Sequence, residues 1–561
     1  MTPSAWFIVI AINGAIVMWG LWKARETHES VDWFLAARSL PWWMVGLSMF
    51  ATAVDSGDYV AVAGGAYQQG LPYLSAWWLG MTTGWMLMAW VILMPLYRSG
   101  MFTNCEYLEA RFGPSARLIA VLIQIQSRTN VLANVAFSLF LTFKTLTDWG
   151  DQSWWFVIGI AAAAAAYTAT GGLRSVAVTD AMQSVVMLIA ALVLWWCVWD
   201  NVGGAAGFQQ KLADHIAADR LDASVARAMT HIGATADAAN PPILVAFGWI
   251  VVLTAYCVVN QSQAMRMLAA RSWWDLRMAA VAAALVTAVV MWFNVTLGTL
   301  GRAVFPDLEH PDDIFPQLIE QFLLPLGGML VGVVVAGLLA GGISTYDSIG
   351  SALSSLITRD IYARFLVRDA DDRHYLLVSR IITFIVIAMS FVYIPFLESG
   401  MVKLYLKLVG VAVVPLLTVF LLGVTTPFAR SSGTVGLVVG VACGLTRFID
   451  ALPAWWTNTY WGYVWSIAVT GAAMSGVTLI RGPASPKELA GLTWSRRHER
   501  IAVTPTAGDS DWLNSSRTKV PEVPEYPFDV PPGGLSWYLR PGVWTVVVVT
   551  VVALLNLVVF W

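Results

Sequence analysis

The chain has 561 residues, of which 58% are hydrophobic and only 12% are charged. These proportions lie outside the usual range of soluble globular domains and indicate that lipid surrounds most of the chain. The formal net charge is −2, so the overall electrostatics indicate neither a nucleic-acid partner nor an anionic surface. Any function must therefore reside in local sites of a membrane protein.

Residues suited to metal or redox chemistry are poorly placed for a membrane enzyme. The four cysteines, Cys105, Cys197, Cys257 and Cys443, are widely spaced, so they predict neither a metal-ligand pair nor a disulfide framework. All six histidines fall in predicted loops, which argues against haem ligation and against a histidine proton relay inside the bilayer. We therefore expect neither an enzyme nor a bound cofactor.

Long apolar segments recur along the whole chain. A membrane-spanning helix needs about 20 mainly apolar residues, and about fourteen segments meet this condition, which predicts an all-α membrane protein. The first segment lacks a basic start and a small-residue cleavage site, so we interpret it as a retained helix. The predicted spans are Ala5–Trp22, Trp42–Gly65, Leu74–Leu96, Leu118–Phe143, Trp154–Thr170, Val176–Trp199, Pro242–Met267, Met278–Leu300, Leu323–Leu356, Tyr375–Phe396, Val402–Thr425, Val435–Phe448, Tyr460–Ile480 and Val543–Trp561.

Lys and Arg are concentrated in one alternate set of the loops between these spans, at residues such as Arg98 and Arg271. Short cytoplasmic loops carry the excess of such residues, so we assign this set to the cytoplasm. Because the number of spans is even, both termini are then expected outside the inner or plasma membrane. Residues 481–540 are predicted to be a cytoplasmic, partly disordered linker between a membrane core, 1–480, and a last helix, 541–561.

Two carboxylates lie inside the second predicted span. Asp55 and Asp58 belong to the run from Phe50 to Tyr59, which is rich in small and polar residues and forms helix poorly. Charge within a span is costly, so the run predicts a helix break near the midplane, where transporters bind ions and substrate. The alternative is a pair of carboxylates at a helix end exposed to water.

The ninth predicted span contains two adjacent hydroxyls, Ser344 and Thr345, followed by the carboxylate of Asp347. Sodium needs several oxygen ligands, which hydroxyls and the carbonyls of a broken helix can supply. Alternatively, Ser and Thr in a span bond back to their own helix or join neighbouring helices.

Basic residues also fall inside predicted spans. Arg128 lies in mid-span, where a buried guanidinium requires a partner, and Asp55 or Asp58 is the natural candidate. A structural ion pair and a contact with substrate are equally good interpretations of Arg128. Lys407 can line a substrate site or extend toward the membrane surface, whereas Lys403 is close enough to the outer end to extend.

A motif after the fifth predicted span resembles a known family. The segment Tyr167–Ser175 reads Tyr-Thr-Ala-Thr-Gly-Gly-Leu-Arg-Ser, and Asp180 and Gln183 follow it. This pattern resembles the hallmark of the sodium:solute symporter family, and shorter matches in the family's order cover nearly the whole chain. Gly171 and Gly172 also suit a tight turn between two helices.

This resemblance, which extends to the family's sodium/glucose branch, implies a leucine-transporter-type fold with five-helix inverted repeats at about 42–199 and 242–425. It also implies a sodium site with ligands from two spans. The implied ligands are the backbone oxygens of Ala51, Val54 and Gly341 and the hydroxyls of Ser344 and Thr345. Three carboxylates are expected close behind these ligands, Asp180, Asp55 and Asp347, and of these Asp180 matches a family carboxylate.

The sugar site of the family does not carry over as a set. The positions that hold polar sugar contacts in a sugar-transporting member are occupied here by Asp58, Trp77, Gly80, Leu253, Thr287 and Lys407. Tyr256 matches an aromatic residue that covers the sugar from the inside, so a gate is expected there. The residues predicted to contact substrate are Asp58, Trp77, Arg128, Tyr256, Asn260, Thr287 and Lys407.

Together these features predict a secondary active transporter that couples sodium to a small polar solute by alternating access. The solute is expected to be a sugar, a sugar derivative, an amino acid or an organic acid. Sodium, this solute and lipid are the expected partners, and the oligomeric state stays open. Two alternatives remain, a proton-coupled carrier that uses Asp55 or Asp347 and a sensor that binds solute without moving it.

Overall fold

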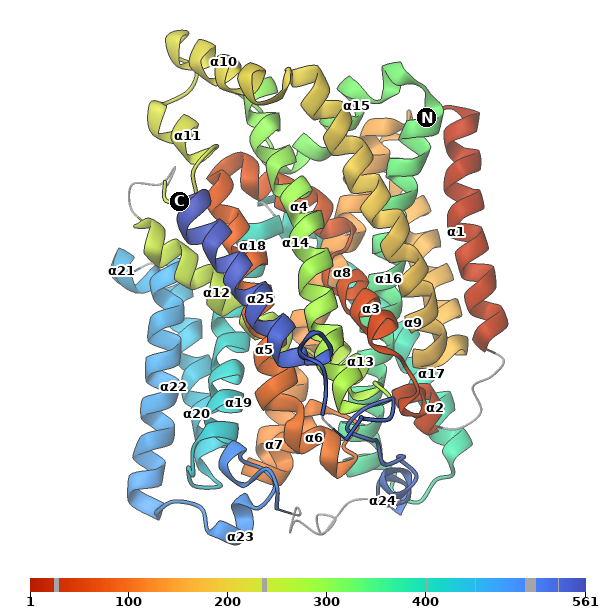
Figure 1. The fold of residues 1–561 in the computed structure, drawn as a ribbon, viewed down its shortest axis with the longest axis vertical. Coiled ribbons are helices and arrows are strands. Elements are labelled where there is room, and N and C mark those ends of the chain that lie inside the picture. Colours follow the sequence, from red (N-terminus) through yellow and green to blue (C-terminus); the bar gives the residue numbers. More distant parts are fainter. Residues whose placement is uncertain (25–29, 235–239, 400, 450, 500–510, 533) are drawn as a thin grey trace.

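A computed structural model describes residues 1–24, 30–234, 240–399, 401–449, 451–499, 511–532 and 534–561. The described chain is nearly all helical, and one isolated bridge, between Leu40 and Ala270, is its only β-type pairing. Figure 1 shows an upright bundle in which both chain ends lie toward the upper end. The all-α class predicted from the apolar runs is confirmed.

The helices of the first half lie between the N-terminus and Ala228. They are α1 (Pro3–Ala24), α2 (Ser30–Leu35), α3 (Trp42–Ala53), α4 (Ser56–Gln69), α5 (Thr82–Leu87), α6 (Leu93–Ser99), α7 (Asn104–Phe112), α8 (Pro114–Leu146), α9 (Ser153–Val202), α10 (Gly204–Ala217) and α11 (Ala223–Ala228).

The helices of the second half continue to the C-terminus. They are α12 (Pro242–Val259), α13 (Gln261–Leu268), α14 (Trp273–Val304), α15 (Ile314–Phe322), α16 (Gly328–Leu356), α17 (Asp372–Ser390), α18 (Met401–Leu408), α19 (Val414–Thr425), α20 (Ser432–Leu445), α21 (Ala454–Thr457), α22 (Thr459–Arg481), α23 (Pro486–Leu489), α24 (Asp511–Thr518) and α25 (Pro541–Leu554).

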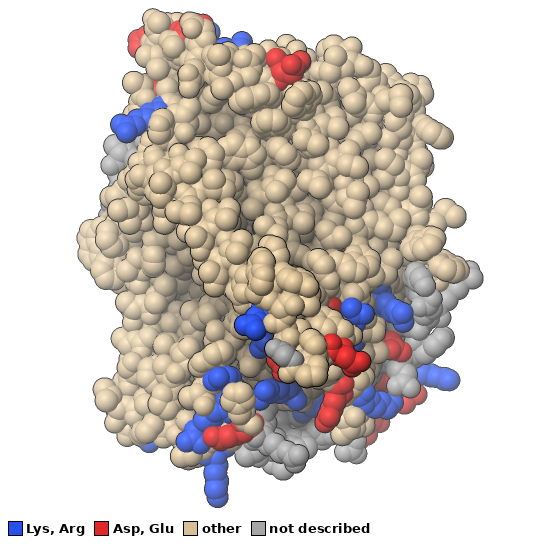
Figure 2. All heavy atoms as spheres, viewed as in Figure 1, with Lys and Arg blue, Asp and Glu red and all other residues tan. Residues whose placement is uncertain are grey.

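Within the described ranges, 11 helical segments are long and apolar enough to cross a membrane, and two further apolar helices are shorter. The shorter ones are Trp42–Ala53 and Ser432–Phe448. Figure 2 shows a broad surface belt almost without charged side chains, with most of the visible Lys and Arg gathered below it. These features fit a multi-pass membrane protein, and the number of fourteen spans stays a prediction.

The segment of α9 turns back on itself at Gly172, whose φ is 65° and ψ is 175°. The hydroxyls of Tyr167 and Thr179 lie 2.7 Å apart across this turn. In a straight helix, twelve residues would rise about 18 Å, so the contact requires two helices side by side. The tight turn predicted at Gly171 and Gly172 is therefore confirmed, and it separates the two spans predicted there.

The second predicted span is broken between α3 and α4. Val54 and Asp55 are extended, and Asp55 caps α4 by accepting from the backbone N–H of Asp58 at 3.0 Å. The Asp58 carboxylate accepts in return from the N–H of Asp55 at 3.1 Å, which completes a capping box. The break predicted from the polar run is confirmed, and its chemical cause is this reciprocal cap.

A second break was missed from the sequence. The segment Pro242–Met267, predicted as one span, divides at Asn260, which is extended between α12 and α13. Its side chain accepts from the backbone N–H of Ser262 at 3.0 Å and so caps α13. The cap begins a polar run, Asn260–Gln263, and α13 places Arg266 in the buried core.

The central helices surround the two breaks. α16 packs against α9, α14 packs against α3 and α4, and α8 packs against α4, while α1 lies outside against α9 and α16. The described linker residues 511–532 and 534–540 pack along the lower end of the bundle, where the rings of Trp512 and Tyr375 stack with their centroids 4.2 Å apart. The linker residues 500–510 lie outside the described residues.

Candidate functional site

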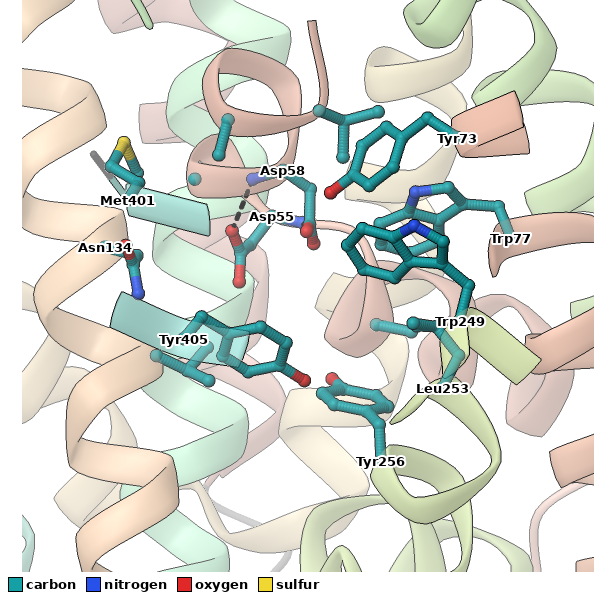
Figure 3. Close-up of a pocket in the computed structure, with 15 residues that line it drawn as sticks. Asp55, Asp58, Tyr73, Trp77, Asn134, Trp249, Leu253, Tyr256, Met401 and Tyr405 are labelled. Carbon is teal, nitrogen blue, oxygen red and sulfur yellow. Dashed lines mark hydrogen bonds between the residues drawn. The ribbon is translucent and has the colours of Figure 1, made fainter. Parts of the chain in front are cut away.

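A pocket opens beside the break between α3 and α4, and helices α4, α8, α12 and α18 contribute to its walls (Figure 3). Its described lining combines two carboxylates, five large aromatic rings and several apolar side chains. The lining residues are Ala53, Asp55, Gly57, Asp58, Ala61, Val62, Tyr73, Trp77, Val131, Asn134, Trp249, Leu253, Tyr256, Met401 and Tyr405.

Asp55 and Asp58 lie together on one side of the pocket (Figure 3). One oxygen of each carboxylate is used in the capping box, which leaves the other oxygen of each for a ligand. Among the described residues, no Lys or Arg lies within ion-pairing distance of either carboxylate. The pocket is thus lined by two carboxyl groups without a basic partner among the described residues, that of Asp55 buried and that of Asp58 half-buried.

Aromatic side chains form the rest of the wall. Tyr73 and Trp249 meet edge to face with their ring centroids 4.5 Å apart, and Trp77 stands beside them. The indole N–H groups of Trp77 and Trp249 are buried and have no hydrogen-bond partner among the described residues. Tyr256 and Tyr405 close the lower side of the pocket in Figure 3.

The Tyr256 hydroxyl donates to the backbone carbonyl of Thr52 at 3.0 Å and so ties α12 to α3 below the pocket. The guanidinium of Arg128 lies 4.6 Å from the centre of the Tyr256 ring. Its three nitrogens have no hydrogen-bond partner among the described residues. The predicted ion pair of Arg128 with Asp55 or Asp58 is therefore wrong for the described residues, and Arg128 faces an aromatic ring instead.

The loop Pro311–Asp313 lies across α4 at the opposite end of the pocket. Asp312 accepts from the backbone N–H of Met401 at 3.2 Å, so the loop is joined to α18, and Met401 itself lines the pocket. Burial raises the pKa of Asp312 to about 6, against the opposing effect of the Met401 N–H. A Cβ at Gly64 would lie 2.5 Å from the Asp312 carboxylate, so glycine permits this approach.

Four of the residues predicted to contact substrate do not line the pocket: Arg128, described above, and Asn260, Thr287 and Lys407. Asn260 uses its side-chain oxygen to cap α13, and Thr287 lies in the core of α14. Lys407 places its ammonium nitrogen 5.0 Å from the ring centre of Phe448. Tyr405, two residues earlier, occupies the pocket, because residues two apart point to opposite sides of a helix. The side chain of Lys403 lies outside the described residues.

The oxygens predicted to bind sodium lie where α3 ends against α16. The Ser344 hydroxyl oxygen lies 3.0 Å from the carbonyl oxygen of Ala51, in the last turn of α3. The Thr345 hydroxyl is buried without a hydrogen-bond partner among the described residues. A Cβ on Gly341 would lie 3.3 Å from the backbone of Asp55 and Ser56, so the two helices approach closely here. The oxygens of Ala51 and Ser344 therefore lie together where α3 meets α16, and the Thr345 hydroxyl next to Ser344 is without a partner among the described residues.

Asp180 binds the neighbouring polar groups rather than standing free. Its carboxylate accepts from the hydroxyls of Ser344 at 2.7 Å and Ser48 at 2.5 Å. The guanidinium of Arg266 pairs with it at 2.9 Å and also donates to Ser348. Asp180 thus lies next to the candidate sodium ligands, with its charge balanced by Arg266.

Asp347 lies one turn beyond Ser344 on α16. One of its oxygens accepts from the Thr168 hydroxyl at 2.6 Å, and the other has no hydrogen-bond partner among the described residues. Asp347 is fully buried and does not line the pocket. The three carboxylates predicted behind the sodium ligands are therefore divided: Asp55 lines the pocket, Asp180 is paired, and Asp347 bonds to Thr168.

Sequence reasoning missed several pocket residues. Tyr73, Trp249 and Tyr405 come from three separate segments, and aromatic residues are so frequent in this chain that none of them stood out. Asn134 lies three residues after Val131 on α8, so the two lining residues share one face of that helix.

The sequence profile of the sodium:solute symporter family matches residues 33–440. The chain belongs to this family. It is 27% identical over 590 residues to the sodium/glucose cotransporter 4 of Danio rerio, covering 96% of this chain and 87% of that one. It is 28% identical over 555 residues to the sodium/myo-inositol cotransporter 2 of Mus musculus, covering 90% and 80%.

Solved structures place the symporter's fold among known transporters. A sodium-coupled sialic acid symporter in a substrate-bound, outward-open state superimposes with a TM-score of 0.71 at 18% identity, covering 86% of this chain and 99% of that one. A nucleobase-cation-symport-1 family transporter in a closed conformation superimposes with a TM-score of 0.51 at 13% identity, covering 81% and 96%. These likenesses show the fold, which is the leucine-transporter type.

Proposed function

We propose that this protein is a secondary active transporter, and not an enzyme, that couples sodium entry to uptake of a small polar solute. The observation that carries the proposal is the meeting of the broken helix α3–α4 with the hydroxyls of α16, beside a pocket lined by aromatic side chains. Membership of the sodium:solute symporter family supports the same conclusion. The solute class includes sugars, sugar derivatives, amino acids and organic acids.

Sodium binds between α3 and α16 in this proposal. Its ligands are the backbone oxygens of Ala51, Val54 and Gly341 and the hydroxyls of Ser344 and Thr345. Since these oxygens come from two helices, bound sodium stabilises one arrangement of α3 relative to α16. Asp180 accepts a hydrogen bond from Ser344 and so holds this ligand in place. Arg266 balances the negative charge of the Asp180 carboxylate, so Asp180 does not bind sodium in place of the proposed ligands.

Solute binds in the pocket above Tyr256, and access alternates between its two ends. The lower closure is the bond from Tyr256 to Thr52 at the end of α3. The upper closure is the bond from Met401 to Asp312. The end of α3 contributes sodium ligands and also accepts the hydrogen bond from Tyr256. Loss of sodium therefore weakens the lower closure and lets solute leave toward the inside.

We further propose that the lower, basic end of the bundle faces the cytoplasm of a cell inner or plasma membrane. Figure 2 shows most of the visible Lys and Arg at that end, as the positive-inside rule requires. Both termini then face outside. With a potential of about 100 mV, entry of one sodium ion releases about 2.3 kcal/mol before its concentration gradient is counted.

Uptake into proteoliposomes tests this function. Solute accumulation should require an inward sodium gradient at constant pH and should stop when potassium replaces sodium outside. Uptake driven equally well by a proton gradient in potassium medium would favour the carrier that uses Asp55 or Asp347. Solute binding without uptake would favour a sensor.

A further inference from the structure

The pocket carries more negative than positive charge. Asp55 and Asp58 both line it, whereas none of the other described lining residues is basic. The nearest described guanidinium is that of Arg128, which lies one turn before Val131 on α8 and faces the Tyr256 ring. Lys407, the other candidate base, lies against Phe448 outside the pocket. Arg128 forms no ion pair with Asp55 or Asp58, so neither carboxylate has a basic partner among the described residues.

A surplus carboxylate in such a place is costly unless a cation joins it. Asp55 is only 4% exposed, and the walls around both acids are aromatic. An ionised group without a partner in this environment is strongly disfavoured. The two carboxylate oxygens outside the capping box can each accept an N–H from one ammonium group. Aromatic faces within reach of a cation add about 0.5–2 kcal/mol each.

The same pocket also contains donors without acceptors. The indole N–H groups of Trp77 and Trp249 are buried and have no hydrogen-bond partner among the described residues. An unsatisfied buried donor costs about 1–3 kcal/mol, so a ligand oxygen at this wall would be stabilising. Figure 3 shows both indoles across the pocket from Asp55 and Asp58. A ligand that spans the pocket thus needs a cationic end and an oxygen-bearing end.

We propose that the transported solute carries an ammonium group that binds between Asp55 and Asp58, and oxygen atoms that accept from the indole N–H groups of Trp77 and Trp249. An amino sugar, an amino polyol or a small amino alcohol has this chemistry. The inference rests on the proposed transport function and narrows its substrate class. It disfavours organic acids, whose carboxylates would face two like charges.

The test compares compounds of similar size in which one hydroxyl-bearing group is replaced by an ammonium group or a carboxylate. Glucosamine, glucose and glucuronate form one series, and ethanolamine, ethylene glycol and glycolate form a second. Each is titrated against the purified full chain in sodium and in potassium, with heat of binding and thermal unfolding as readouts. In sodium, the amine of at least one series should bind tenfold or more tightly than its neutral parent, and the acid should not bind.

Choline, which has a quaternary ammonium group without N–H donors, extends the amine series. It tests whether the cation is bound through N–H bonds to the carboxylates or through aromatic contact. Weaker binding of choline than of ethanolamine would show that N–H donors to the carboxylates are needed. Equal binding would show that aromatic contact with the cation is sufficient. Both results support an ammonium ligand.

Variants connect the preference to the residues. Asp58→Asn keeps an oxygen that accepts from Asp55 but removes one charge, so it should lower the amine's affinity tenfold or more. Asp151→Asn, in an exposed pair with Lys144, is the matched control and should bind like the wild type. If Asp58→Asn does not fold, Trp249→Phe provides the second test, because it removes one indole donor and should weaken glucosamine more than ethanolamine.

Two failures are distinguishable. The ammonium inference is overturned if a neutral parent or an acid binds more tightly than the amine, or if no amine binds. In that case, binding of any compound that is tighter in sodium than in potassium still supports symport. If sodium alone does not stabilise the protein against potassium, and no compound responds to sodium, the proposed function itself fails.

Discussion

Arg266 and Asp180 form a fully buried ion pair, with Nη2 of the guanidinium 2.9 Å from Oδ2 of the carboxylate. The pair joins α13 to α9, and Ser48 at the centre of α3 bonds to both partners. Three helices around the candidate sodium site thus share one charge-balanced cluster. Removing one partner of a buried pair leaves an uncompensated charge, which costs about 3–5 kcal/mol.

We therefore expect Arg266→Gln to lower the unfolding temperature of the detergent-solubilised protein by several degrees. Arg128→Gln is the matched control, because Arg128 is equally buried but loses no ion pair among the described residues. Its unfolding temperature should change much less. Equal losses in the two variants would show that the Asp180 contact is not what stabilises this region. Both are measured by thermal unfolding in sodium buffer.

Thr345→Ala should raise the sodium concentration that gives half-maximal uptake. The Thr345 hydroxyl has no hydrogen-bond partner among the described residues, so its removal disturbs no internal bond but removes one sodium ligand. A bond to a charged group is worth about 1.5–3 kcal/mol, which corresponds to roughly tenfold or more in sodium affinity. Ser351→Ala, farther along α16, is the control and should leave the sodium dependence unchanged. A normal sodium dependence in Thr345→Ala would remove this hydroxyl from the site.

The fold was largely readable from the sequence because apolar length sets the spans. The long polar run at Asp55 predicts the break there. The break at Asn260 was missed although a polar run, Asn260–Gln263, directly follows the apolar run. The turn at Gly172 is predicted both by the interval between two apolar runs and by the pair of glycines in the family motif.

The pocket was less readable because helix faces decide its lining. Lys407 was chosen on the correct helix but points away, and Tyr405 points inward. Arg128 was assigned a carboxylate partner because buried charges usually need one. Its position against Tyr256 depends on how α8 and α12 pack, which no local pattern specifies.

Asp312 should make stability depend on pH. Burial raises its pKa to about 6 from an ordinary 3.8, so the folded state binds its proton more tightly than the unfolded state. The stabilisation is complete below pH 3.8 and is lost as the pH rises through about 6. Since one pKa unit is worth about 1.4 kcal/mol, the loss is at most about 3 kcal/mol.

Asp312→Asn should therefore be more stable than the wild type at pH 7 and should lose this part of the pH dependence. Asparagine keeps an oxygen for the Met401 N–H, so the contact with α18 is preserved. Asp313 also has a raised pKa from burial and His310 is nearby, so a residual slope should remain. Thermal unfolding of both proteins between pH 4 and 7 measures the difference, and parallel curves would contradict the assignment to Asp312.

The linker segment 511–540 should detach from the bundle when Arg517 is removed. Arg517 on α24 pairs with Glu106 on α7 at 3.1 Å, and Arg359 holds the same carboxylate from the other side at 3.3 Å. Burial alone would raise the pKa of Glu106, but the charges of Arg517, Arg359 and Arg117 outweigh it and hold the pKa at about 2. The carboxylate is therefore ionised at neutral pH and attracts Arg517 strongly.

Loss of such a charged contact costs about 1.5–3 kcal/mol, so Arg517→Ala should increase the population of the detached linker roughly tenfold or more. Chymotrypsin cleavage within 511–540 should accelerate accordingly, because proteolysis follows the open population when opening is fast. Arg496→Ala is the control, since Arg496 pairs with Glu499 at the exposed surface. If both variants are cleaved at the wild-type rate, Trp512 and Tyr375 hold the segment without help from the ion pair, because their stacking is unchanged in either variant.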